Sequence, residues 1–501
     1  MEPAAYRGGG HLFTVILLGS KCIKHESRAR DLVRAPMSYK IIQKHDRKND
    51  MKIIIVGAGK AGIRLARTLT EEGHDITILD NNANKLSAAC SDNDVLGIIG
   101  NGMSYSSLSI AGLSDADLLI AVTGSDEYNL LCCLFGKKAG HCSTIARIRN
   151  PLYLNETQFI KEQIGLSMVV NPEFAAAREI SRLLRFPSAV EVNSFAKGRL
   201  DMITFKVPPT SLLNGRDLIY VRTKLMSEVL FCNVERGGKY YIPSGNFELH
   251  SGDKATVIIR PKDAQKFFKR VNIDTHSVKD AMIVGGGTMG FYLARQLLDN
   301  KIAVKIIERD ELRCEDLAER LPDALIIHGN ASDKNLLLEE GLTNTDAFVA
   351  LTGLDEENAI LSLYAKEVSD AKVVTKVNRV IFNDLIERLN LDSIIYPQNI
   401  TTEHIMQYVR AKQNAMGNNV ETLYNLVDDK IEALEFKIGS DSPMIGVPIK
   451  QMNLKENLII CGINRGKRVI LPNGDDTIQA GDHVVVVTSQ KKLTDFNDIF
   501  K

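Results

Sequence analysis

The hydrophobic pattern of residues 51–80 predicts a strand, a helix and a second strand in close succession. Residues 53–56 form an uninterrupted apolar run, which is typical of a strand buried in a parallel sheet. Residues 76–79 form a second apolar run, which ends at Asp80. Between the two runs, apolar residues recur at helical spacing, at Ile63, Leu65, Ala66 and Leu69. The segment therefore has the pattern of a βαβ unit.

The pattern continues downstream with further strand and helix signals. Residues 118–122 form another apolar run of strand length, residues 144–148 are a further predicted strand, and residues 128–138 between them have a helical pattern. Strands that alternate with helices of this length predict a parallel, doubly wound sheet with right-handed crossovers.

Three glycines follow the first strand in the order G-x-G-x-x-G. Gly57 permits the tight turn, Gly59 lets the backbone approach a pyrophosphate, and Gly62 lets the helix pack close to the strand. The helix N-terminus adds free N–H groups and the positive end of its dipole. Asp80 follows Gly62 at nearly the spacing expected of a carboxylate that accepts hydrogen bonds from ribose hydroxyls. The pattern predicts a nucleotide site; the alternative is a glycine-rich turn that serves packing alone.

The whole pattern occurs twice, because residues 281–308 repeat residues 51–80. The repeated fingerprint and acidic positions are Gly285, Gly287, Gly290 and Glu308, and the spacing from the last glycine to the acid is the same in both copies. Three further segments recur at a nearly constant offset, namely 98–102 at 326–331, 121–127 at 350–356, and 144–147 at 373–376. A register held over this length indicates an internal duplication.

Each copy is followed by a different, strand-rich segment. These segments begin near residues 203 and 433, and each ends in a Gly-Asp turn that leads into an apolar strand, at Gly252-Asp253 and Gly481-Asp482. Residues 172–185 and 401–413 are helix-like and rich in charge. The predicted order is A–B–A′–B′ with a hinge near residues 276–279. Its boundaries are a leader at 1–50, A units at 51–187 and 279–415, and B units at 188–275 and 416–501.

Composition narrows the class of protein. A chain of 501 residues with 44% apolar and 25% charged residues is expected to fold into two to four soluble domains. Its net charge of zero and its lack of tryptophan give no support to nucleic-acid binding. The eight cysteines have no zinc-binding spacing, so reduced thiols and no metal site are expected.

The leader, residues 1–50, shows no sustained periodicity. Its longest apolar run, residues 12–18, is far shorter than the roughly 20 residues that a membrane helix needs. We interpret the leader as a disordered tail or as an over-extended start of the translated frame.

Further candidate ligand contacts follow later strands. The loop Thr123-Gly124-Ser125 falls at the carboxyl edge of the sheet, where dinucleotides bind. The alternative is a plain turn in which Ser125 or Asp126 caps the next helix. Arg147 could bind a phosphate bidentately and Lys376 as a point charge, or both could be solvated surface cations.

The acidic positions favour NAD over NADP, because Asp80 would repel a 2′-phosphate. ATP and ADP carry the same ribose hydroxyls and phosphates, so they remain alternative ligands. The B units lack an acid/base constellation, and His250 and His483 stand at unmatched places in the repeat. We therefore predict that the chain is not an enzyme. The alternatives are an NAD-dependent oxidoreductase with an unrecognised substrate site and a scaffold that binds no nucleotide.

The doubled order of glycine fingerprint, acid and Gly-Asp module over residues 51–501 resembles the TrkA family. These are cytoplasmic regulatory subunits of Trk potassium-uptake systems, built of tandem RCK (regulator of potassium conductance) domains. The resemblance implies two Rossmann-like parallel sheets, each followed by a small α+β domain of the RCK C-terminal type. It also implies binding of NAD(H), or of adenine nucleotides in some members. The chain would assemble as a dimeric or tetrameric ring beneath a membrane potassium transporter, peripheral on the inner face of the plasma membrane.

By position, the resemblance also implies the nucleotide contacts, to which the motif adds Gly62 and Gly290. In the first half they are Gly57, Ala58, Gly59, Lys60, Ala61, Asp80, Thr123, Gly124 and Arg147. In the second half they are Gly285, Gly286, Gly287, Thr288, Met289, Glu308, Thr352, Gly353 and Lys376. Two departures stand out: Asn101 and Asn330 occupy positions where many relatives carry Asp, and Lys376 replaces the arginine of the first half.

Overall fold

The computed structural model describes residues 50–501, apart from 155, 187, 196–197, 226–227, 274–277, 379–388, 390, 415–419, 428–430, 441, 467, 491–492 and 494. The predictions for the leader, and for part of the hinge near residues 276–279, lie outside the described residues. The chain divides into two compact units, one up to Val170 and one from Asn171, and each is described by itself. The predicted domain boundaries stay predictions.

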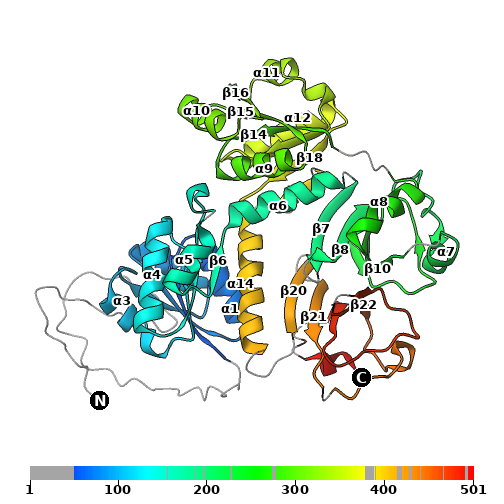
Figure 1. Cartoon of the computed structure of the whole chain (residues 1–501), viewed down its shortest axis with the longest axis horizontal. Coiled ribbons are helices and arrows are strands. Elements are labelled where there is room, and N and C mark those ends of the chain that lie inside the picture. Colours follow the sequence, from blue (N-terminus) through cyan, green and yellow to red (C-terminus); the bar gives the residue numbers. More distant parts are fainter. Residues whose placement is uncertain are drawn as a thin grey trace, which may run out of the picture. The chain divides into compact units, whose positions relative to one another are not determined.

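The first compact unit, coloured blue to cyan in Figure 1, contains a six-stranded parallel sheet. Its strand order is β3-β2-β1-β4-β5-β6. Its strands are β1 Lys52–Val56, β2 Asp75–Asp80, β3 Leu96–Ile99, β4 Leu118–Ala121, β5 Ser143–Arg147 and β6 Met168–Val170. Its helices are α1 Lys60–Glu71, α2 Ala83–Asp92, α3 Tyr105–Ile110, α4 Asp126–Ala139 and α5 Thr157–Ile164. This is the predicted doubly wound fold, in which the order of connection reverses between β1 and β4.

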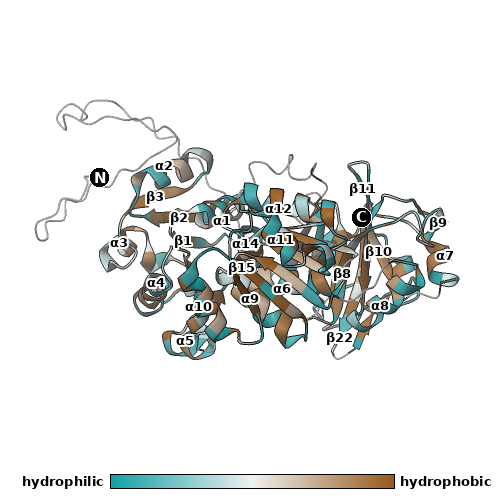
Figure 2. Cartoon of the chain, turned by 90° about the horizontal axis from the view of Figure 1, so that it is seen from above, coloured by the Kyte–Doolittle hydropathy of each residue, from teal (hydrophilic) through white to brown (hydrophobic). Residues whose placement is uncertain are grey.

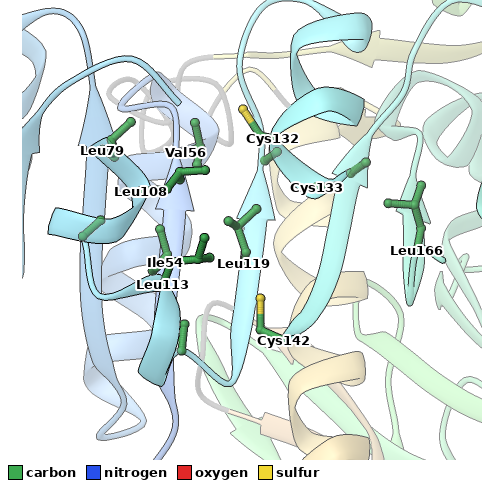
Figure 3. Close-up of a cluster of buried hydrophobic side chains, with 14 of the residues drawn as sticks. Ile54, Val56, Leu79, Leu108, Leu113, Leu119, Cys132, Cys133, Cys142 and Leu166 are labelled. Atoms are coloured by element: carbon green, nitrogen blue, oxygen red, sulfur yellow. The ribbon is translucent and has the colours of Figure 1, made fainter. Parts of the chain in front are cut away.

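The core of this unit follows from the apolar runs identified in the sequence. Ile54 and Val56 of β1 and Leu119 of β4 point to one face of the sheet, where they meet Leu108 of α3 and Cys132 of α4 (Figure 3). All five side chains are nearly or fully buried. Burial on both faces explains why the central strands are continuous apolar runs.

The second compact unit contains a second parallel sheet with the matching order β16-β15-β14-β17-β18-β19. Its strands are β14 Asp280–Val284, β15 Ala303–Glu308, β16 Leu325–His328, β17 Ala347–Ala350, β18 Lys372–Lys376 and β19 Ser393–Ile395. Its helices include α9 Thr288–Asp299, α10 Glu311–Arg320, α11 Lys334–Glu339 and α12 Asp355–Val368. The predicted duplication of the parallel sheet is confirmed.

Two antiparallel five-stranded sheets complete the second compact unit, in the corresponding orders β7-β8-β13-β10-β11 and β20-β21-β24-β22-β23. The first, here called the B1 sheet, consists of β7 Ala189–Phe195, β8 Leu200–Lys206, β10 Leu230–Arg236, β11 Lys239–Tyr241 and β13 Lys254–Ile259. The second, the B2 sheet, consists of β20 Val420–Val427, β21 Ile431–Lys437, β22 Leu458–Arg465, β23 Arg468–Ile470 and β24 His483–Thr488. The B1 part also holds the short strands β9 Arg216–Asp217 and β12 Glu248–Leu249 and the helices α7 Leu218–Thr223 and α8 Pro261–Arg270.

The Gly-Asp turns lie where they are predicted. Gly252 and Gly481 have positive φ angles of 91° and 81°, and each turn leads into a buried strand, β13 or β24. The B strands begin earlier than the sequence indicated, with β7 and β20. Both of these edge strands carry polar residues among their apolar ones, which weakens the apolar signal.

The two charged, helix-like segments are α6 (Pro172–Arg185) and α14 (Pro397–Asn414), and α6 packs against α9. Phe174 of α6 makes an edge-on contact with Tyr292 of α9, with ring centroids 5.4 Å apart. The side-chain amide of Asn171 donates to the Tyr292 hydroxyl at 3.0 Å. Figure 2 shows α9 coloured largely as apolar, in keeping with its burial between the sheet and α6.

The second parallel sheet is fastened to the B1 sheet by two polar side chains. The ammonium group of Lys372, at the start of β18, donates to the carbonyl oxygen of Ala189 in β7 at 2.6 Å. The hydroxyl of Ser393, at the start of β19, donates to the carbonyl oxygen of Val190 at 3.0 Å. Lys372 is only 8% exposed, so these bonds lie in a nearly dry contact.

The stability of the chain should therefore depend on the protonation of Lys372. Burial lowers the pKa of Lys372 from 10.5 to about 8, although Asp392 opposes the shift. The protonated lysine thus disfavours the folded state below pH 8, and this penalty fades as the pH rises towards the pKa of the unfolded chain. Between pH 7.5 and 10, we expect the free energy of unfolding of the unmodified chain to gain about 2 kcal/mol more than that of Lys372→Met. Urea unfolding at both pH values measures this difference, and equal changes in the two chains would contradict it.

Within the residues that the structure describes, no helix is both long enough and apolar enough to cross a membrane. The seven cysteines in that part of the chain form no disulfide with one another.

Candidate functional site

The first glycine fingerprint forms a tight turn between β1 and α1. Gly57 has a φ of +110°, which side chains other than that of glycine rarely allow. Its N–H donates to the carbonyl oxygen of Leu79 at 2.8 Å, so the turn is joined to the end of β2. A Cβ atom at Gly57 would also lie 3.2 Å from the backbone of Thr123, which follows β4. The turn therefore brings the ends of β1, β2 and β4 together.

The other two glycines of this fingerprint have different roles. A Cβ atom at Gly62 would lie 1.8 Å from the carbonyl oxygen of Gly57, so only glycine fits where α1 crosses the turn. A Cβ atom at Gly59, the N-cap of α1, would meet nothing within 4 Å. Gly59 thus faces open space at the N-terminus of α1, which is where the glycine pattern predicts a phosphate.

Asp80 lies at the end of β2, beside this turn. One of its carboxylate oxygens accepts from the N–H of Ala58 at 2.7 Å, and the other accepts from the N–H of Asn82 at 2.8 Å. Each carboxylate oxygen has two acceptor positions, so both can still accept a hydrogen bond from a ligand hydroxyl. Two backbone N–H groups therefore fix the orientation of the Asp80 carboxylate beside the turn.

The second fingerprint reproduces this geometry. Gly285 has a φ of +102°, and a Cβ atom at Gly290 would lie 2.3 Å from its carbonyl oxygen. Glu308 accepts from the N–H of Gly286 at 2.7 Å, as Asp80 does from Ala58. Gly287 is the N-cap of α9 and faces open space.

In the second site, helix α10 contacts the fingerprint turn through side chains that were not among the predicted site residues. Arg313 of α10 donates to the carbonyl oxygen of Gly286 at 2.9 Å. A Cβ atom at Gly286 would lie 2.4 Å from the side chain of Leu317, whereas the first site has Ala58 at this position. In the second half, α10 therefore packs directly against the fingerprint turn.

Two buried asparagines that the sequence analysis missed hold the loops after β4 and β17. The side-chain oxygen of Asn129 accepts from the N–H and the hydroxyl of Thr123 at 2.8 and 2.7 Å, and its amide donates to the carbonyl oxygen of Arg147. The side-chain oxygen of Asn358 likewise accepts from the N–H of Thr352, and its amide donates to the carbonyl oxygen of Lys376, whereas the Thr352 hydroxyl donates to the carbonyl oxygen of Leu354. Both asparagines are fully buried. Their recurrence at the offset of the repeat was the signal that could have identified them.

The two predicted cations lie at the sites but bind backbone in this structure. The guanidinium group of Arg147 donates to the carbonyl oxygen of Thr123. The ammonium group of Lys376 donates to the carbonyl oxygen of Leu351 at 2.9 Å. Burial lowers the pKa of Lys376, while Asp355 and Glu173 act in the opposite direction. Both cations thus support the loop that faces the glycine turn, and their contact with a phosphate stays a prediction.

The loop after β4 also serves as a helix cap, which was the alternative interpretation. The Ser125 hydroxyl accepts from the N–H of Tyr128 at 3.2 Å. Asp126 accepts from the N–H groups of Arg149 and Asn150, both at 2.8 Å. Arg149, which the sequence analysis did not select, donates to the carbonyl oxygen of Gly124 at 2.6 Å.

Asn101 and Asn330 each accept hydrogen bonds within their own turns. The side-chain oxygen of Asn101 accepts from the N–H of Met103 at 2.9 Å and from the hydroxyl of Tyr128 at 2.7 Å. The side-chain oxygen of Asn330 accepts from the N–H of Ser332 at 3.0 Å.

The remaining predicted contacts are backbone positions around the two turns. Lys60 and Ala61 begin α1, and Thr288 and Met289 begin α9. A Cβ atom at Gly124 or Gly353 would meet nothing within 4 Å. The structure therefore places all predicted site residues in two matching sites, each at the carboxyl ends of its strands. No cluster that could hold a metal ion occurs among the described residues.

Comparisons with known proteins match these features. Residues 53–172 and 281–397 each match the TrkA-N domain family, and residues 202–272 and 433–501 each match the TrkA-C domain family. The chain is 34% identical over 446 residues to the Trk system potassium uptake protein TrkA of Haemophilus influenzae, covering 88% of this chain and 96% of that protein. It is 31% identical to the protein of the same name from Halomonas elongata, covering 90% and 99% of the two chains.

Solved structures with the same fold include the GsuK channel bound to NAD. The TM-score is 0.59 at 15% identity, covering 89% of this chain and 78% of that one. The GsuK RCK domain gives the same TM-score and identity, with 94% of its chain covered. At this level of identity the likeness establishes the fold.

Proposed function

The chain belongs to the TrkA family of potassium-uptake proteins, and on that premise we propose that it is a nucleotide-sensing regulatory subunit of potassium transport. It binds NAD(H) at its two parallel sheets, with ATP or ADP as alternative ligands, and controls a Trk-type transporter in the membrane. It acts from the cytoplasmic face of the plasma membrane as a homo-oligomeric ring. The names of its relatives support the link to potassium uptake.

The observation that carries this proposal is the doubled site. In both halves a helix N-terminus opens onto free space at Gly59 or Gly287. In both halves the acid is oriented by a backbone N–H of the turn, at 2.7 Å in each case. A helix N-terminus that faces free space suits a pyrophosphate, and an oriented carboxylate suits the 2′- and 3′-hydroxyls of an unphosphorylated ribose.

Regulation requires a route from the site to the rest of the chain, and β18 provides one. Its last residue, Lys376, supports the loop at the second site, and its first residue, Lys372, donates to the B1 sheet. A ligand that changes the position of β18 therefore acts on both ends of one short strand. The ligand must bind one arrangement better than the other, and a coupling of about 1–3 kcal/mol changes an equilibrium roughly 5–150-fold.

The proposed role needs binding and no chemical step. The side chain of His250 faces Glu248 at 3.8 Å and that of His483 faces Glu435 at 3.9 Å. His250 lies in the turn between β12 and β13, His483 is the first residue of β24, and neither is among the residues predicted for the two nucleotide sites.

Removing the charge of both acids should weaken nucleotide binding selectively. For Asp80→Asn with Glu308→Gln we expect NADH to bind about 10- to 100-fold more weakly, because hydrogen bonds to a charged acceptor contribute about 1.5–3 kcal/mol. The affinity for NADPH should fall less than that for NADH, since the 2′-phosphate of NADPH no longer meets a carboxylate. Fluorescence titration of the two cofactors measures both changes. The control is Asp115→Asn, an exposed carboxylate that precedes β4 at the opposite edge of the sheet.

The regulatory part of the proposal has its own readout. Potassium uptake into vesicles that contain the transporter and the chain should respond to NADH, and the response should disappear with Asp80→Ala plus Glu308→Ala. An unchanged response from that folded variant would remove both acids from the mechanism. A second outcome would refute only the regulatory role: the variant loses NADH binding, but NADH does not change potassium uptake even with the unmodified chain. The nucleotide site would then still be supported.

A further inference from the structure

The B1 and B2 sheets share one apolar core within the second compact unit. Leu200 and Met202 of β8 and Val485 and Val487 of β24 belong to the same buried cluster. The guanidinium group of Arg199 donates to the carbonyl oxygen of Gly466 at 2.6 Å, which adds a hydrogen bond across this contact. The two repeats thus meet face to face through their antiparallel sheets.

Cys232 and Cys461 occupy equivalent positions in this contact. The offset between them in the sequence is the offset of the repeat. Cys232 is the residue at a register shift of β10, and Cys461 is the residue at a register shift of β22. A bulge re-aims the extra side chain, and here it leaves both thiols fully buried in the shared core.

The two strands approach each other closely at this point. Cα atoms of β10 and β22 come within 8 Å, which is less than the ~10 Å usual between packed sheets. Gly462, next to Cys461, allows this approach, because a Cβ atom there would lie 2.7 Å from the side chain of Leu200. Burial raises the pKa of the Cys461 thiol, and a hydrogen bond with Cys232 raises it further. The two thiols are therefore neighbours across the contact.

We propose that Cys232 and Cys461 are a dithiol modification site, which a two-electron thiol oxidant converts into an intramolecular disulfide joining the B1 and B2 sheets. In the reaction, the two thiols lose two protons and two electrons as one S–S bond forms. A low-molecular-weight disulfide takes these up and leaves as two thiols; diamide takes them up at its N=N bond and becomes a hydrazine. This inference goes beyond the proposed function and does not depend on it.

Burial of the two thiols limits the access of the oxidant. Both thiols are fully buried, which shields them from the oxidant. Oxidation therefore requires transient opening of the contact between the two sheets. Once formed, the disulfide closes a long loop, from Cys232 to Cys461, that contains the whole second parallel sheet. It then resists separation of the B1 and B2 sheets.

To test this, the full chain is oxidised with diamide and its residual thiols are then blocked with iodoacetamide under denaturing conditions. The disulfides are mapped by peptide mass spectrometry. We expect a Cys232–Cys461 disulfide, faster migration on a non-reducing gel, and a rise in Tm of about 5 °C that a reductant reverses. Cys461→Ala should lose all three effects. Cys133→Ala, which removes an equally buried thiol from the first compact unit, should keep them.

Alkylation of both Cys232 and Cys461 after oxidation, or a disulfide that pairs either with another cysteine, would overturn the proposal. The comparison of the oxidised and reduced unmodified chain needs no substitution, so it holds even if Cys461→Ala folds poorly.

Discussion

A chain carrying Gly59→Asp and Gly287→Asp is expected to keep its fold and to bind NADH at least about 100-fold more weakly than the unmodified chain. Both glycines are N-caps with extended backbone and with open space at the Cβ position. Aspartate is a favoured N-cap residue, so α1 and α9 should be as stable as before or slightly more so. Its carboxylate would occupy the space in front of the helix N-terminus, where it competes with the pyrophosphate and repels it.

The matched control is Gly59→Asn with Gly287→Asn, which has the same shape and capping ability without the charge. We expect it to weaken binding less than the aspartates do, and the difference measures electrostatic repulsion. Isothermal titration calorimetry gives the dissociation constants, and thermal unfolding verifies the fold. Wild-type affinity in the aspartate variant would show that no phosphate binds at these helix termini.

Gly62→Ala is expected to lower the free energy of unfolding of the first compact unit by about 3 kcal/mol. The added Cβ atom would lie 1.8 Å from the carbonyl oxygen of Gly57. Because this neighbour is backbone, no change of rotamer relieves the clash, and α1 must move away from β1. Gly290→Ala should act in the same direction in the second half, where the corresponding distance is 2.3 Å.

Chemical unfolding followed by circular dichroism measures this loss. Gly59→Ala is the control, because it adds the same methyl group earlier in the same turn, in open space. It should lower the free energy of unfolding by no more than about 1 kcal/mol, because alanine is a poorer N-cap residue than glycine but meets no steric clash here. Equal effects of the two alanines would mean that α1 does not cross the turn at Gly62 as described.

The sequence predicted those parts of the fold that depend on local chemistry. The apolar runs of β1 and β14 and the glycines that follow them identified both parallel sheets, because a buried strand and a tight turn each restrict residue type. The duplication extended this result to the second half. Asp80 and Glu308 could be identified in the same way, because each follows an apolar run directly and therefore marks the end of its strand.

Residues whose partners are distant in the sequence were harder to predict. Arg147 was recognised as a cation near the site, but its bond to Thr123 depends on how two loops meet. Asn129 and Arg149 were missed for the same reason, although Asn129 recurs as Asn358. A repeated polar residue inside an apolar helical pattern is a signal for such a contact.

The cysteine pair shows a second limit of the sequence. The sequence analysis predicted only ordinary reduced thiols at Cys232 and Cys461, because neither is part of a motif. Each strand has a bulge at its cysteine, and both side chains lie in the core that the two sheets share. A bulge follows from the register between strands, which the order of residues does not specify by itself.

The central claim is that one phosphate-binding fold was duplicated and that both copies bind a nucleotide. Equilibrium dialysis of NADH against the full chain, Gly59→Asp, Gly287→Asp and the double variant tests it most directly. The account predicts two molecules bound per unmodified chain, one per single variant and none in the double variant. No binding to the unmodified chain, or binding that neither substitution reduces, would contradict it.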